Sequence, residues 1–204
     1  MGTIILVEGL SDQAALEVIA TGTADGRAGR RSGRLTVMTA EDPKATLQRY
    51  LQEGRDAMLF KLAGLSEYDV RRPMTPTGTN LLGLVKHLSQ IELGYFGETF
   101  GRPSPDQLQL DFEHDPNADL MAEAGESREY IIGLYHQAWE HADATISALP
   151  LDAPGQVPWW GDHGDVTLHR ILVHVATETN RHAGQADIVR EMIDGVVGLR
   201  SPGN

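Results

Sequence analysis

Residues 172–187 read Leu-Val-His-Val-Ala-Thr-Glu-Thr-Asn-Arg-His-Ala-Gly-Gln-Ala-Asp, and three of their side chains, His174, Glu178 and His182, repeat at a spacing of four. Four residues make about one helical turn, so all three side chains leave one face of a predicted helix. The same face carries the apolar residues Leu168, Ile171, Val175 and Ala186. The face therefore points at a core, where imidazole and carboxylate groups need partners, and a divalent cation is one such partner.

The composition limits the classes of function. The chain has 204 residues, a net charge of −12, 41% hydrophobic residues and no cysteine. This length is enough for one domain with a substantial core. Lack of cysteine excludes disulfides, thiolate metal ligands and a cysteine nucleophile. The negative charge disfavours nucleic acid and anionic membranes as partners, and the sequence shows neither a transmembrane run nor a secretion signal. We expect a cytoplasmic protein with a small-molecule substrate.

The first 40 residues differ in composition from the rest. Residues 21–34 are rich in glycine, arginine, threonine and serine, which predicts a linker in a poorly ordered tail. Residues 1–20 resemble the start of a Toprim domain, whose glutamate would match Glu8, but the later acidic pair of such a domain has no counterpart in context. We interpret residues 1–40 as an extension, with Met38 as a candidate true start.

The rest of the chain predicts an all-α fold, a four-helix bundle over residues 41–196 followed by a tail at 197–204. Helices are expected at about 43–65, 80–100, 127–148 and 167–194, with N-caps at Asp42, Thr79 or Asn80, Ser127 and Thr167 and a stop at Gly195. Long loops separate the second, third and fourth helices. The last loop contains Trp159 and Trp160, which either line a pocket mouth or cover the end of the bundle.

The helix face that carries His174, Glu178 and His182 needs a ligand from another helix to make a metal site. His174 and His182 are separated by about 12 Å of helical rise, so one ion cannot easily be held by both. His87 lies mid-helix among apolar neighbours and is the best further ligand. With Glu178 and His182 it would form a site of two histidines and one carboxylate, with positions open for water or substrate. A hydrogen-bonded core network and a solvated helix edge are open alternatives for the same spacing.

Two segments resemble a known family. Residues 71–88 and 167–191 are similar to the DinB/YfiT-like superfamily of four-helix metal-binding proteins. The similarity is greatest to its mini-circle protein branch, which is related to mycothiol- and bacillithiol-dependent S-transferases, and it extends from about residue 41 to 196.

The resemblance implies a set of metal ligands. His87 and His182 match two histidines of the family, and Glu178 stands where the family has a middle histidine. A carboxylate is a competent substitute for that imidazole. His174 is the reserve ligand if the helix shifts by one turn, and Gln185 matches a polar residue after the last histidine.

The resemblance also implies an activity, the transfer of a low-molecular-weight thiol such as mycothiol to an electrophilic small molecule. Zinc is the expected ion, with nickel, iron or manganese as alternatives, and a bound cation lowers the pKa of the thiol. The expected pocket residues are Trp159, Trp160, Arg181 and Gln185. Two other functions stay open: a non-catalytic metal-binding or structural helical bundle that dimerises, and a metal-dependent hydrolase that uses the same ligands.

Overall fold

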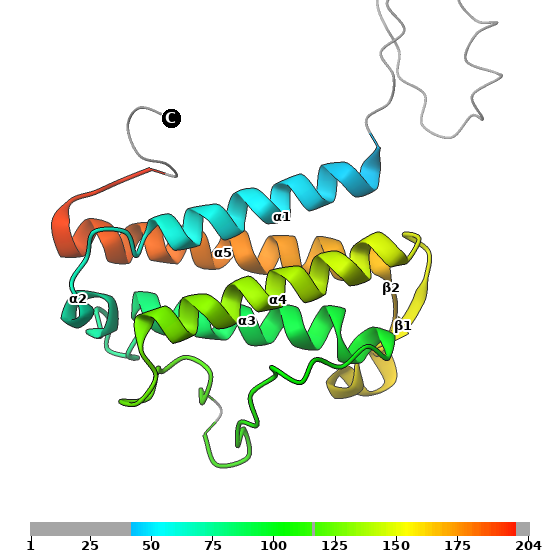
Figure 1. The fold of residues 1–204 in the computed structure, drawn as a ribbon, viewed down its shortest axis with the longest axis horizontal. Helices are drawn as coiled ribbons and strands as arrows, with labels where there is room; N and C mark the ends of the chain where they lie inside the picture. Colours follow the sequence, from blue (N-terminus) through cyan, green and yellow to red (C-terminus); the bar gives the residue numbers. More distant parts are fainter. Residues whose placement is uncertain (1–41, 116, 199–204) are drawn as a thin grey trace, which may run out of the picture. The chain divides into compact units, whose positions relative to one another are not determined.

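The computed structural model describes residues 42–115 and 117–198. The expectations about residues 1–40, Glu8 and Met38 lie outside these residues, as does most of the predicted C-terminal tail. The chain forms four long helices, which pack together as a bundle (Figure 1) and confirm the predicted all-α class. These helices are α1 (Pro43–Phe60), α3 (Leu81–Phe96), α4 (Arg128–Ala148) and α5 (Leu168–Asp194).

Local side-chain chemistry fixes where the long helices begin. The side chains of Asp42, Asn80, Ser127 and Thr167 each accept a hydrogen bond from a backbone N–H of the first helical turn. Such bonds satisfy donors that the first turn of a helix leaves without a partner. At the far end of α5, Gly195 adopts the left-handed conformation with φ of 80° and ends the helix.

The long helices pack through their apolar faces. α1 packs against α5, and α3 packs against both α4 and α5. The apolar residues predicted on one face of α5 are buried. Those residues, all 0% exposed, are Leu168, Ile171, Val175 and Ala186. This packing brings the face of α5 with the titratable residues toward α3.

A buried ion pair crosses the core between three helices. Arg55 of α1 is 1% exposed, and its guanidinium donates to the carboxylate of Glu92 on α3, which is 0% exposed. The same guanidinium donates to Asp143 of α4 at 3.0 Å. A charge pair in this position is costly to break from one side, because the remaining charge stays buried.

Shorter elements fill the connections, and the sequence patterns did not predict them. The first helix ends at Phe60 instead of about residue 65, and the second becomes a 3₁₀ turn after Gly97. The loop before α5 contains a two-stranded antiparallel hairpin. The short elements are α2 (Glu67–Arg71), η2 (Glu98–Phe100), β1 (Pro154–Gln156), η3 (Pro158–His163) and β2 (Asp165–Thr167).

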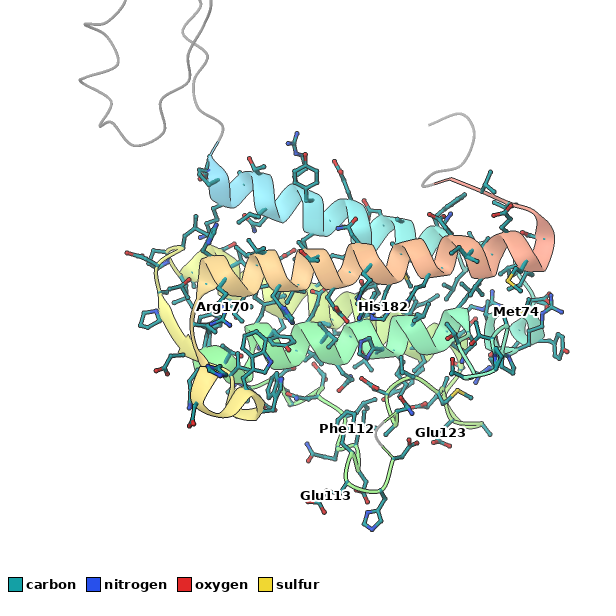
Figure 2. The ribbon with its side chains drawn as sticks, turned by 180° about the vertical axis from the view of Figure 1, so that it is seen from behind. Met74, Phe112, Glu113, Glu123, Arg170 and His182 are labelled. Atoms are coloured by element: carbon teal, nitrogen blue, oxygen red, sulfur yellow. The ribbon has the colours of Figure 1, made fainter. Side chains whose placement is uncertain are left out.

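The connection between η2 and α4, residues 101–127, is here called the α3–α4 loop. Figure 2 shows the loop segment that carries Phe112 and Glu113 lying outside the four long helices. The loop is tied back to α3 by Lys86, whose ammonium donates to the carbonyl of Met121 at 3.0 Å and to Glu126 at 2.9 Å. Gly83 of α3 permits a close approach, since a Cβ there would lie 1.8 Å from a loop carbonyl oxygen.

Within the described residues, no helix is long and apolar enough to cross a membrane.

Candidate metal centre

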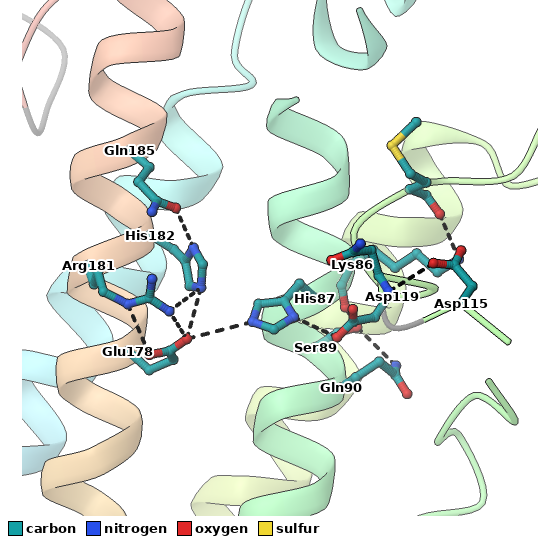
Figure 3. A network of polar contacts seen from close by, with 12 residues as sticks. Lys86, His87, Ser89, Gln90, Asp115, Asp119, Glu178, Arg181, His182 and Gln185 are labelled. Atoms are coloured by element: carbon teal, nitrogen blue, oxygen red, sulfur yellow. Dashed lines mark hydrogen bonds and ion pairs between the residues drawn. The ribbon is translucent and has the colours of Figure 1, made fainter. Parts of the chain in front are cut away.

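The structure brings three predicted ligands together between two helices. His87 comes from α3, and Glu178 and His182 come from successive turns of α5, as Figure 3 shows. One ligand atom of each residue lies within 4.8 Å of the others. Oε1 of Glu178 is 2.9 Å from Nε2 of His182 and 3.8 Å from Nε2 of His87. The spacing of four on α5 and the packing of α3 on α5 together produce this convergence.

The outer nitrogen of each imidazole has its own partner. Nδ1 of His87 lies 2.6 Å from Oδ2 of Asp119, and Nδ1 of His182 lies 2.7 Å from Oε1 of Gln185. In the tautomer in which Nδ1 of each ring donates to these oxygens, each Nε2 keeps a lone pair. Two lone pairs and a carboxylate therefore converge on one space, an arrangement that a cation satisfies. The donor set and its outer partners fit a divalent metal.

Arg181 supplies positive charge at the same place. Its Nε donates to Oε2 of Glu178 at 3.2 Å, and its Nη2 contacts Oε1 of Glu178 and lies 3.1 Å from Nε2 of His182. The Arg181 side chain is 53% exposed. It can therefore turn into solvent when another cation takes its place between the ligands.

The electrostatics of the site favour the forms of Glu178 and His182 that coordinate a metal. Burial, reinforced by the nearby His87, lowers the pKa of His182 below its ordinary value. Burial alone would raise the pKa of Glu178, but the hydrogen bonds and positive charge of Arg181, with a contribution from the nearby His182, outweigh it and lower that pKa. A neutral imidazole and an ionised carboxylate are the forms that coordinate cations.

His174, the reserve ligand, lies elsewhere on α5 and is not among the three residues that converge. Its ring packs edge-on against Tyr95 at 4.7 Å and Trp160 at 5.1 Å between centroids. Burial lowers the pKa of His174. Trp160 also lies 5.0 Å from the guanidinium carbon of Arg170, so its ring belongs to a packed cluster at one end of the bundle.

Two cavities flank His87. The first has a volume of about 440 Å³, and Glu178, Arg181, His182 and Gln185 lie in its wall with His87. The second, of about 590 Å³, is lined by His87 and Trp159. Of the four expected pocket residues, Arg181 and Gln185 thus line the first cavity, Trp159 lines the second and Trp160 lines neither.

Sequence reasoning missed Asp119. This residue is 7% exposed and lies in the α3–α4 loop, 32 positions after the histidine that it contacts. Nothing in the local pattern distinguishes it from the other acidic residues of the loop, which are largely exposed. Its role becomes visible only when the loop is seen folded against α3.

Comparisons with known proteins agree with the fold and suggest an activity. A model of the mycothiol-S-transferase family matches residues 46–195. The chain is also similar in structure to a conserved protein of Enterococcus faecalis, with a TM-score of 0.50 and 16% sequence identity, over 76% of this chain and 96% of that one. No curated protein matches the chain significantly. At this identity the structural likeness concerns the fold alone.

Proposed function

The chain belongs to the mycothiol-S-transferase family, and from this membership we propose that it is a metal-dependent transferase that conjugates mycothiol to an electrophilic small molecule. The observation that carries the proposal is the convergence of His87, Glu178 and His182 at a cavity of about 440 Å³. A cavity of this size is in the range of small-molecule sites.

In this proposal His87, Glu178 and His182 hold the metal. Zinc is the ion that we favour, and nickel, iron and manganese also suit imidazole and carboxylate ligands. A bound divalent cation with open positions supplies a lowered thiol pKa, and hence a thiolate at neutral pH. Asp119 and Gln185 orient the two imidazoles through their Nδ1 atoms.

The nucleophile must come from the cosubstrate, because the chain has no cysteine. The cavity beside the ligands is suited to a polar thiol, since Thr77, Asn117, Arg181 and Gln185 lie in its wall. In the reaction the thiol sulfur bonds to the electrophilic carbon, the leaving group departs with its electron pair, and the thiol proton passes to solvent.

The test combines elemental analysis with a conjugation assay. The purified protein is compared with a His87→Ala, His182→Ala double variant and with a control variant, His114→Ala, His163→Ala, which removes two exposed histidines. We expect about one metal ion per chain and mycothiol conjugation in the parent and the control, and neither in the first variant.

Two results would contradict the proposal. A parent that stays metal-free after incubation with zinc, nickel, manganese and iron(II) would rule out the metal site. Stoichiometric metal without conjugation of any electrophile would rule out the transferase and favour a hydrolase or a structural metal site.

A further inference from the structure

A second cavity adjoins the metal centre on the other side of His87. Its volume is about 590 Å³, and it is enclosed by α3, the α3–α4 loop and Trp159 of η3. Its wall is mainly apolar and includes Ile91, Leu108, Phe112, Tyr95 and Trp159. The character of this wall differs from that of the first cavity, which contains the charged ligands.

The two cavities share wall residues at the candidate metal centre. His87 and Leu120 line both of them. Asp119, whose Oδ2 contacts Nδ1 of His87, also borders the second cavity. A molecule in the second cavity therefore lies beside the imidazole ring whose Nε2 faces the ligand cluster. Two molecules, one in each cavity, would both lie against this ring.

Aromatic rings from two separate elements face the second cavity. Trp159 packs edge-on against Tyr95 with 5.1 Å between centroids, and its Nε1 donates to the Tyr95 hydroxyl at 3.4 Å. Gly94 makes room for the indole, since a Cβ there would lie 3.1 Å from the Trp159 ring. Trp159 is thus packed against α3, while 49% of its surface stays exposed.

Phe112 of the α3–α4 loop is the second of these rings, and it is 51% exposed. Large exposed aromatic surfaces that converge on a concave site mark a binding site for an apolar ligand. Gln107 adds an amide at the wall that can pair with a polar substituent on such a ligand.

We propose that this second cavity binds the electrophile, and that the electrophile is a flat aromatic compound with a leaving group. The chemical step rests on the proposed function, whereas the binding does not. The thiolate sulfur forms a bond to the ring carbon that carries the leaving group, the leaving group departs with the bonding electrons, and the thiol proton has passed to solvent.

Binding is tested first with meta-dinitrobenzene, which has no leaving group of this kind and requires no turnover. Its dissociation constant is measured by calorimetry for the parent, for Trp159→Ala, for Phe112→Ala and for Tyr130→Ala. Tyr130 is a matched control, because it is 49% exposed and lies outside the cavity. We expect each cavity variant to weaken binding about fivefold, the effect of one lost aromatic contact, and the control to bind like the parent. Equal affinity in all four proteins, or no binding to the parent, would overturn the proposal.

Turnover is tested second, with mycothiol and two electrophiles, aromatic chlorodinitrobenzene and small aliphatic iodoacetamide. We expect Trp159→Ala to raise KM for chlorodinitrobenzene about fivefold and to leave KM for iodoacetamide unchanged. An equal change for both electrophiles would overturn the assignment of the cavity. If dinitrobenzene binds as expected but the parent conjugates neither electrophile, the transferase function fails while the aromatic binding site stands.

Discussion

Asp119 is expected to set the metal affinity of the site although it is not among the three ligands. Its Oδ2 lies 2.6 Å from Nδ1 of His87, and both side chains are largely buried, at 9% and 15% exposure. Loss of such an outer partner typically weakens metal binding by 10- to 100-fold. Asp119→Asn keeps an acceptor oxygen but loses the charge, so we expect about a tenfold loss, or about 1.4 kcal/mol. Asp119→Ala removes the acceptor too and should approach about 100-fold.

Gln185 provides the comparison within the same site. Its Oε1 makes the equivalent contact with Nδ1 of His182 at 2.7 Å, but the residue is neutral and exposed. Water can replace it, so we expect Gln185→Ala to weaken metal binding by about threefold or less. The structure thus predicts a ranking, in which the loop carboxylate contributes more than the amide on α5.

The assay is a titration of metal-free protein with Zn²⁺ in competition with a chromophoric chelator, and circular dichroism of the metal-free variants checks that each has folded. Parent-like zinc affinity in both Asp119 variants would refute the reasoning. So would a larger loss in Gln185→Ala than in Asp119→Ala, because the charged partner would then not be the stronger one.

Three further predictions concern the fold around the site. Glu92→Ala leaves its guanidinium partner buried without full compensation and should lower the free energy of unfolding by about 3–5 kcal/mol, as urea denaturation would show; an unchanged midpoint would contradict this. Burial lowers the pKa of His182 below 6.5, so its contribution to stability is present above pH 6.5 and is lost as the pH falls through the folded-state pKa. In chelator, the melting temperature of His182→Gln should therefore depend less steeply on pH over this range than that of the parent. Gly83→Ala would place a methyl group against a loop carbonyl and displace Asp119, so zinc titration should show weakened binding, whereas Gly133→Ala, which meets nothing within 4 Å, should bind zinc like the parent.

The sequence predicted those parts of the structure that depend on local chemistry. The N-caps Asp42, Ser127 and Thr167 could be predicted because each is a short polar residue before a run with helical apolar spacing. The buried face of α5 could be predicted from that spacing alone. The convergence of Glu178 and His182 follows from the same spacing. His87 was selected as their partner from its position in the middle of a predicted helix among apolar neighbours, and the family resemblance supported that choice.

The rest depends on how distant segments fold against one another. The contact of Asp119 with His87 exists because Lys86 and Gly83 hold the α3–α4 loop on α3, and no periodic pattern reports this. The strands of the hairpin have three residues each, too short for alternation to be recognised. The two adjacent tryptophans also have different surroundings. Trp159 lines the second cavity, whereas Trp160 packs in the cluster at one end of the bundle.

The α3–α4 loop serves two parts of the molecule at once. It contributes Asp119 to the metal centre, and it contributes Leu108 and Phe112 to the wall of the second cavity. A substitution or an insertion that reshapes this wall for a different compound also moves the carboxylate that orients His87. If the second cavity binds the electrophile as proposed, a change of substrate preference through this loop is therefore expected to alter metal binding as well.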